Sequence, residues 1–251
     1  MLPKVFKPSG QYDLVRLGKN NDGGYLICVN SYKQSDCLVS FGINNDFSFE
    51  KDFKGKTKIK ILAFDPTVTN NFFFKEILLN LLSLKINKFF FSIINFIKFK
   101  NFFNSNDNQF FLKKIGKGGN VNLSYISIGE IIKLTDNSSN IFFKIDIEGS
   151  EYRILDEILQ FEDMISGLTI EFHDVDLNQN RIENFINKTK LKLIHIHANN
   201  WMDYGLDAIP TCIEMSFSKN PNLINDKVEL PHKLDQKNNP DSSDIILKFN
   251  K

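Results

Sequence analysis

The chain lacks several patterns that mark common classes of protein. Only three of its 251 residues are cysteines (Cys28, Cys37 and Cys212), and none stands in the CxxC spacing of zinc or redox sites. This odd, scattered set does not predict a disulfide framework, so we expect buried, reduced thiols. The first residues, MLPKVFKPSGQYD, contain no apolar signal core. These absences predict a cytoplasmic protein.

An excess of one charge is absent as well. The 31 Lys and Arg residues balance 30 Asp and Glu residues, which leaves a net charge of +1 and argues against nucleic acid as a partner. No stretch reaches the roughly 18 uninterrupted apolar residues of a membrane-spanning helix. Hydrophobic residues still make up 42% of the chain, enough to build a substantial core for one α/β domain.

Short apolar runs that end at acidic or turn residues alternate with longer amphipathic stretches. The runs predict strands at residues 37–41, 59–64, 141–145, 168–172 and 191–196, helices at 150–165 and 177–189, and a last edge strand at 245–249. Strands joined by crossover helices indicate a mainly parallel sheet with helices on both faces. A ligand site is then expected beyond the carboxyl ends of the strands.

Residues 70–112 interrupt this alternation. They are apolar and rich in Phe, with Lys or Asn every few residues, which predicts one or two amphipathic helices inserted after the second strand. Three roles remain open for this insertion: a cover over the active site, a contact in a homo-oligomer, or a membrane-surface helix with Lys on its polar face. Residues 104–109 within it predict an exposed loop.

Three strand ends carry residue types suited to a nucleoside. Gly42 follows the first strand, where a glycine permits a sharp turn and a close approach to a ligand. Asp65 ends the next strand 23 positions later, near the roughly 20-residue spacing at which an acidic side chain accepts hydrogen bonds from ribose hydroxyls. Asp146 ends the third. Taken singly, a turn glycine and a solvated aspartate remain alternatives. A dehydrogenase with a related sheet is disfavoured, because Gly42 lacks the GxGxxG context.

Three of the four histidines fall at the ends of two further strands, in IEFHD (Glu171, His173) and HIHANN (His195, His197). Alternation along a strand places Glu171 and His173 on one side, and His195 and His197 on a shared side of their own strand. His195 lies deeper in its strand and is expected to be structural. His232, in the polar tail, is expected to be exposed.

Four motifs together resemble the FkbM-like family of S-adenosylmethionine-dependent methyltransferases. They are DGGY at 22–25, SFGINNDFSFE at 40–50, AFDPT at 63–67 and KIDIEGSEY at 144–152. The resemblance covers residues 13–67 and 120–217 and leaves 70–112 unaccounted for. It implies one bacterial, Rossmann-like class I methyltransferase domain over residues 1–251, with a mostly parallel seven-stranded sheet and a closing strand at 209–217.

The resemblance also implies which residues hold S-adenosylmethionine. The turn after the first strand would wrap the methionine part, Asp65 the ribose, and Ser127 or Ile126 the adenine edge. The full expected set is Phe41, Gly42, Asn44, Asp46, Asp65, Pro66, Ser127 and Asp146. The turn departs from the usual glycine-rich form, but Asn tolerates left-handed backbone geometry, so its shape can be kept.

The implied reaction is O-methylation of a sugar hydroxyl, on a nucleotide-linked sugar or a precursor of a surface glycan such as a capsule polysaccharide. A neutral hydroxyl is a poor nucleophile, so its proton must be removed or polarised. The expected catalytic residues are Asp146, His173 and Glu171. Either His173 or Asp146 is a general base, or Asp146, His173 and His197 hold a divalent metal (Mg, Mn or Fe), or the histidines are structural.

The acceptor is expected to contact Asp22, Tyr25, Asn199, Asn200 and Trp201, because amide and aromatic side chains suit carbohydrate; packed loops are the alternative. Two other functions stay open. The same fold can methylate a small phosphorus-linked, lipid or peptide oxygen, since acceptor loops vary most. The chain can also be a non-catalytic, membrane-peripheral binding protein that uses residues 70–112.

Overall fold

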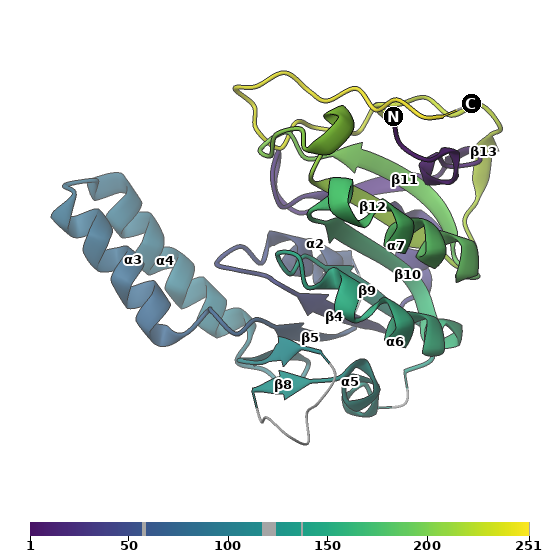
Figure 1. The fold of residues 1–251 in the computed structure, drawn as a ribbon. Coiled ribbons are helices and arrows are strands. Elements are labelled where there is room, and N and C mark those ends of the chain that lie inside the picture. The colour runs from purple at the N-terminus through teal and green to yellow at the C-terminus, as the bar shows by residue number, and fades with distance from the viewer. Residues whose placement is uncertain (57–58, 117–123, 137, 251) are drawn as a thin grey trace.

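The computed structural model describes residues 1–56, 59–116, 124–136 and 138–250. The predicted domain at 1–251 and the resemblance at 120–217 thus include a few residues outside the described part of the chain. The centre of the fold is a seven-stranded sheet in the order β11-β12-β10-β9-β4-β5-β6 (Figure 1). Its strands are β4 (Cys37–Phe41), β5 (Lys60–Phe64), β6 (Asn108–Phe111), β9 (Ile141–Ile145), β10 (Ile165–Phe172), β11 (Lys192–Ala198) and β12 (Ile213–Ser218).

Only β12 runs antiparallel to its neighbours in this sheet; the other pairs are parallel. The predicted seven-stranded, mostly parallel α/β sheet is therefore confirmed. Every residue of β4, β9 and β10 is buried, as expected for strands covered on both faces. The helices are α1 (Val29–Gln34), α2 (Ser48–Lys56), α5 (Ile128–Leu134), α6 (Leu155–Gln160) and α7 (Val175–Lys188), with α3 and α4 described below.

The two faces of the sheet are covered by different elements. One core joins strand residues such as Phe143 and Ile170 to Ile131 of α5, Ile158 of α6 and Phe185 of α7. A second core, on the other face, joins the sheet to α1, α2 and an antiparallel hairpin of β2 (Leu14–Leu17) and β3 (Tyr25–Cys28). This hairpin matters for function, since it carries the DGGY motif to the sheet.

Three sequence predictions need correction. Residues 104–109 are only partly a loop, because Asn108 begins β6, which pairs with β5 at the edge of the sheet. The helix expected at 150–165 is divided into the 3-10 turn Glu151–Arg153, α6 and the 3-10 turn Glu162–Met164. Residues 245–249 form no strand, and Phe249 makes a single bridge to Leu2. The short pair β1 (Gln11–Tyr12) and β13 (Leu223–Asn225) ties the first segment of the chain to the tail.

The stretch after β5 contains two antiparallel helices, α3 (Asn70–Leu82) and α4 (Ile86–Phe102), which project from the body of the molecule (Figure 1). At their base, Phe73 and Phe99 are buried against Ile43, Phe47 and Val68. None of the described helices has the combination of length and apolar character that crossing a bilayer demands. The two short strands β7 (Lys114–Ile115) and β8 (Tyr125–Ile126) then lead to α5.

Candidate functional site

A cavity of about 860 Å³ lies beyond the carboxyl ends of β4, β5, β9 and β10. Gly42, Asp65 and Asp146 all line it, so the three strand ends singled out in the sequence do meet. Backbone bonds hold them together: Gly42 N–H donates to the Phe64 carbonyl (3.0 Å) and Asp146 N–H to the Phe41 carbonyl (3.1 Å). The volume falls in the range of small-molecule and cofactor sites.

At Gly42 the end of β4 lies directly against the end of β9. Its φ is +67°, a left-handed conformation, and a Cβ atom built there would lie 1.5 Å from the carbonyl oxygen of Asp146. No side chain fits at that separation. Asn44, two residues on, has φ +48°, in line with the expectation that asparagine supplies the left-handed geometry of this turn.

The Asp65 carboxylate organises the same turn and retains capacity for a ligand. Its Oδ2 accepts from Asn44 N–H (2.9 Å), and its Oδ1 accepts from the backbone N–H (2.8 Å) and the hydroxyl (2.6 Å) of Thr67. A carboxylate offers about four acceptor positions, so these three bonds leave one on Oδ2 for a hydroxyl of a bound molecule.

The opposite wall of the cavity holds His173, which follows β10, among carboxylates. Its Nδ1 is 3.1 Å from Oε1 of Glu151, and its Nε2 is 3.5 Å from Glu148 and 3.7 Å from Glu171. Burial by itself lowers the pKa of His173, but Glu151, Glu171 and Asp146 outweigh burial and raise the pKa to about 9. The imidazole is therefore protonated at neutral pH when no metal displaces its proton.

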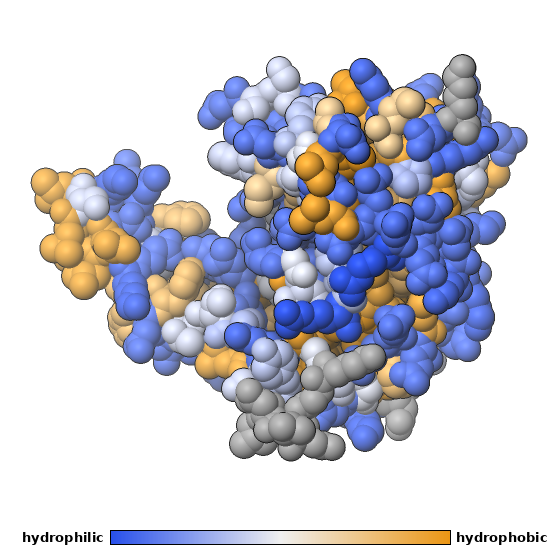
Figure 2. Space-filling model, viewed as in Figure 1, coloured by the Kyte–Doolittle hydropathy of each residue, from blue (hydrophilic) through white to orange (hydrophobic). Residues whose placement is uncertain are grey.

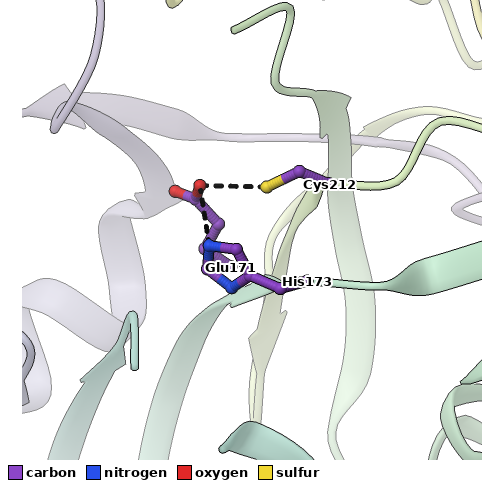
Figure 3. Close-up of side chains that lie close together, drawn as sticks. All are labelled: Glu171, His173 and Cys212. Atoms are coloured by element: carbon purple, nitrogen blue, oxygen red, sulfur yellow. Dashed lines mark hydrogen bonds and ion pairs between the residues drawn. The ribbon is translucent and has the colours of Figure 1, made fainter. Parts of the chain in front are cut away.

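Glu171 lies beside His173 and is almost fully buried. Its Oε1 accepts from Asn199 Nδ2 (2.9 Å) and from the Cys212 thiol (3.0 Å; Figure 3), and its Oε2 accepts from the Tyr25 hydroxyl (3.0 Å). Burial, followed by repulsion from Asp146, raises the pKa of Glu171. The Tyr25 hydroxyl also lies 3.1 Å from Oδ2 of Asp146, so one phenol links the two carboxyl groups.

Lys144 places a positive charge under the turn after β4. Its Nζ donates to the Gly42 carbonyl (2.6 Å) and lies 3.7 Å from Oδ2 of Asp146. Glu50, which accepts a hydrogen bond from Ser40, is buried behind the same turn. Burial raises the pKa of Glu50, and Lys144 opposes that rise. Lys144 was not among the expected site residues, but a lysine within the otherwise apolar run IFFKI could have indicated a buried charge.

Most of the expected site residues line this one cavity. From the cofactor set these are Phe41, Gly42, Asn44, Asp46, Asp65, Pro66 and Asp146, from the catalytic set Asp146, Glu171 and His173, and from the acceptor set Asp22, Asn199 and Trp201. Asp22, in the DGGY motif, belongs to the turn of the β2–β3 hairpin, and this turn edges the cavity. The structure adds Lys19, Ile147, Tyr125 and Arg153, which the sequence argument had not placed there.

Three expected contact residues have other roles. Ser127 caps α5: its hydroxyl accepts from Glu130 N–H, and the Glu130 carboxylate accepts from Ser127 N–H in return. Tyr25 lies behind the cavity wall and supports its two carboxylates. Asn200 is buried under the tail, where its amide donates to the Asn239 carbonyl (2.9 Å). None of the three is among the residues that line the cavity.

His197 does not join Asp146 and His173, so that proposed ligand set is wrong. Its Nε2 is 3.2 Å from Asp244 and its Nδ1 is 3.9 Å from Glu214, its partner across the β11–β12 pair. Within the part of the chain that the structure describes, the groupings able to hold a metal ion are Asp146, Glu148 and His173, and Glu171, His173 and Cys212. His173 is common to both.

The remaining histidines serve the packing of the tail. His195 pairs with Asp235 at 2.8 Å, which agrees with the structural role expected for it. His232 is buried against His195, with ring centroids 6.2 Å apart, so its expected exposure is wrong. All three cysteines are buried and free, as predicted.

The His197–Asp244 pair predicts a pH-dependent stability. Burial lowers the pKa of His197, but Asp244, Glu214 and Asp235 raise it to about 9. A raised folded-state pKa stabilises the fold fully below the ordinary value of 6.5, and this stabilisation is lost as pH rises through about 9. We expect Asp244→Asn to lower the free energy of unfolding by about 2 kcal/mol at weakly acidic to neutral pH, where Asp244 is ionised and His197 is charged.

The difference from wild type should shrink as pH rises and vanish above the His197 titration, in urea unfolding measured across that range. Asp241→Asn, an exposed change in the same tail, should cost little at any pH. A deficit for Asp244→Asn that stays constant with pH would contradict the assignment of this pair.

No protein-family model matches the chain, and no curated protein matches it. Similar solved structures include an rRNA methylase from Streptococcus thermophilus (12% identity, 76% of this chain and 92% of that chain, TM-score 0.39), the 23S rRNA methyltransferase ErmE (6%, 77% and 67%, 0.38) and WbdD (12%, 78% and 40%, 0.38). At these identities and TM-scores the likeness identifies neither a family nor an activity, so function has to be inferred from the residues of the cavity.

Proposed function

We propose that this chain is an S-adenosylmethionine-dependent O-methyltransferase of the FkbM-like kind, acting on a sugar hydroxyl. One observation carries the proposal: a single cavity joins the Gly42, Asp65 and Asp146 strand ends to a wall of His173 and carboxylates. The strand ends supply a close backbone turn and a carboxylate that can accept from ribose hydroxyls. The wall supplies carboxylates and an imidazole that can activate an acceptor hydroxyl, either as a base or as metal ligands. The two parts meet at Asp146, which belongs to both.

The nucleoside end is supported by the chemistry of its lining. The free acceptor position on Asp65 suits a ribose hydroxyl, since neutral hydroxyls donate readily to a carboxylate. Ile115, Tyr125 and Ile147 offer apolar and aromatic surface for a base, in place of the Ser127 contact expected at first.

The acceptor end is supported by its exposed rim. Trp201 lines the cavity with its side chain largely exposed, and Asp22 lies along the same lining. Asn199 is buried beneath them, where its amide donates to Glu171 and accepts from Trp201 N–H, so it supports this rim from below. An aromatic ring can cover the apolar face of a sugar, while a carboxylate binds its hydroxyls. Methyl transfer breaks the C–S bond of the sulfonium, forms a C–O bond and releases the hydroxyl proton, which the protein must accept or pass to water.

Two ways of activating the hydroxyl fit the residues differently. As a base, His173 is poorly suited because its raised pKa keeps it protonated at neutral pH. Asp146, a quarter of whose side chain is exposed, remains as the carboxylate that faces the acceptor. The protonated His173 then stabilises the wall of carboxylates around it.

The other way uses a divalent metal, and the donor set suits one. Two carboxylates and one imidazole are available from Asp146, Glu148 and His173. Mn and Fe accept such a mixed set, whereas Mg prefers oxygen ligands and would use mainly the carboxylates. Glu151 holds Nδ1 of His173 at 3.1 Å, as carboxylates commonly orient a ligating histidine. A metal bound there would lower the pKa of the acceptor hydroxyl. Activity that survives thorough chelation, in protein free of metal, would exclude this route and leave Asp146 as the base.

Asp65→Ala tests the cofactor half of the proposal. Loss of a hydrogen bond to a charged acceptor costs about 1.5–3 kcal/mol, so we expect the affinity for S-adenosylmethionine to fall roughly ten- to hundredfold in calorimetry. Asp36→Ala is the matched control, because Asp36 also holds backbone amides (Ser139 and Asn140), at the opposite end of the strands. Wild-type protein that binds no S-adenosylmethionine would refute the proposal.

A further inference from the structure

The α3–α4 hairpin, defined here as residues 70–103, has a hydrophobic end that nothing in the described chain covers. Leu82 is 71% exposed, Leu84 is 80% exposed and Phe91 is 68% exposed. They belong to a larger exposed set that comprises Phe74, Leu78, Leu79, Leu81, Leu82, Leu84, Ile86, Phe90, Phe91, Ile94 and Ile97. Figure 2 shows hydrophobic surface gathered at the far end of this projection. Exposed apolar surface of this extent marks an interaction site.

Beyond the phenylalanines buried at its base, the hairpin holds polar side chains between its two helices and apolar side chains outside. Ser92 is buried between the helices, where it accepts from the Asn80 amide (2.8 Å) and donates to the Lys88 carbonyl (2.9 Å). Glu76 lies 3.4 Å from the same hydroxyl. Two helices that pack together in water usually have apolar side chains between them and polar side chains toward solvent. Hydrogen-bonded polar side chains between helices, with leucine and phenylalanine outward, match the packing of helices in lipid.

The positive charge of the hairpin indicates that the lipid headgroups are anionic. The hairpin carries five lysines (Lys75, Lys85, Lys88, Lys98 and Lys100) against one glutamate, a net charge of +4 that leaves −3 for the rest of this +1 chain. Lys85 and Lys88 lie at the apolar end itself, where the two helices meet, and both are exposed. Basic groups around an apolar surface complement the anionic headgroups of a bilayer. A second copy of the chain would instead bring two such positive ends together.

We propose that the end of the α3–α4 hairpin inserts into the surface of an anionic membrane, with Leu82 and Leu84 entering the acyl boundary and Lys85 and Lys88 binding headgroups. The helices need not span the bilayer to do this, because an interfacial segment buries its apolar face only about 5–10 Å deep. The base of the hairpin continues into the cavity: Asn95 donates to the Asn45 carbonyl (2.8 Å), and Asn45 lines the cavity. Docking therefore holds the cavity near the membrane surface.

Vesicle co-sedimentation of the full chain tests this inference independently of methyl transfer. We expect the protein to pellet with phosphatidylcholine vesicles that contain phosphatidylglycerol, to bind pure phosphatidylcholine more weakly, and to be released by high salt. The double variant Leu82→Glu/Leu84→Glu should remain in the supernatant. Lys85→Gln/Lys88→Gln should weaken binding about fivefold for each lysine removed.

Matched controls on α7 separate this site from general surface effects. Leu177→Glu replaces an equally exposed leucine, and Lys188→Gln an exposed lysine, far from the hairpin in the fold. Both should pellet as wild type does, with all variants melting at the wild-type temperature because the changed side chains are exposed. Wild type that stays in solution with every vesicle overturns the proposal. A second result would also overturn it: wild type that binds no vesicle but forms a dimer in sedimentation velocity, with Leu82→Glu/Leu84→Glu monomeric. The apolar end would then bind a second copy of the chain and not a membrane.

Discussion

Gly42→Ala is expected to be the most disruptive single substitution in the cavity. The new Cβ would fall 1.5 Å from the Asp146 carbonyl oxygen, in a backbone conformation with φ +67°. The ends of β4 and β9 must separate to admit it, which breaks the bond from Asp146 N–H to the Phe41 carbonyl. We expect a loss of roughly 4 kcal/mol or more in the free energy of unfolding, measured in urea, together with loss of S-adenosylmethionine binding.

Gly55→Ala provides the matched comparison. Gly55 lies in α2, and a Cβ there meets nothing within 4 Å. Alanine in an exposed helix position is more favourable than glycine by up to about 1 kcal/mol, so this variant should be as stable as wild type or slightly more stable. A Gly42→Ala protein with wild-type stability would show that the two strand ends are not packed as described.

Asp146→Asn is expected to give the largest loss of activity in a folded protein. Both proposed routes require this carboxylate, either as the base or as a metal ligand beside Glu148 and His173. Asparagine has nearly the same shape and can still accept from the Tyr25 hydroxyl. We therefore expect kcat to fall about a thousandfold, in the upper part of the range for loss of acid–base catalysis.

The affinity for S-adenosylmethionine should change much less than kcat, because Asp65 and the backbone of the turn remain. Methyl transfer from labelled S-adenosylmethionine to a panel of nucleotide sugars measures the first quantity, and calorimetry measures the second. Asp136→Asn, at an exposed aspartate that pairs with Lys60 away from the cavity, should leave both unchanged. Wild-type turnover by Asp146→Asn would remove both activation routes together.

The central strands were predictable because each is a mainly apolar run that is followed by a residue with a marked turn preference. This holds for β4 before Gly42, β5 before Asp65 and β9 before Asp146. The edge strand β6 escaped notice because it begins Asn-Gln, within a polar stretch that signals a loop. Its pairing with β5 gives these residues a place in the sheet that their own sequence does not favour.

The parts of the site that were missed depend on contacts between distant segments. Tyr25 meets Glu171 across 146 positions of sequence, and His197 meets Asp244 across 47. Strand alternation gives the side of the sheet on which a residue lies, but not which tail or hairpin covers that side. Ser127 is a different case, since Ser127 and Glu130 form the Ser-x-x-Glu pattern of a helix cap, which was legible in the sequence.

The antiparallel strand β12 sets Glu214 directly between two other ionisable side chains, Glu171 on β10 and His197 on β11. Burial raises the pKa of Glu214 to about 8, and the charge on Glu171 adds to that rise. Ionisation of either glutamate thus discourages ionisation of the other. Glu214 is therefore the buried carboxyl group at which the two sides of the sheet oppose each other: the positive charge of His197 lowers its pKa, and the negative charge of Glu171 raises it.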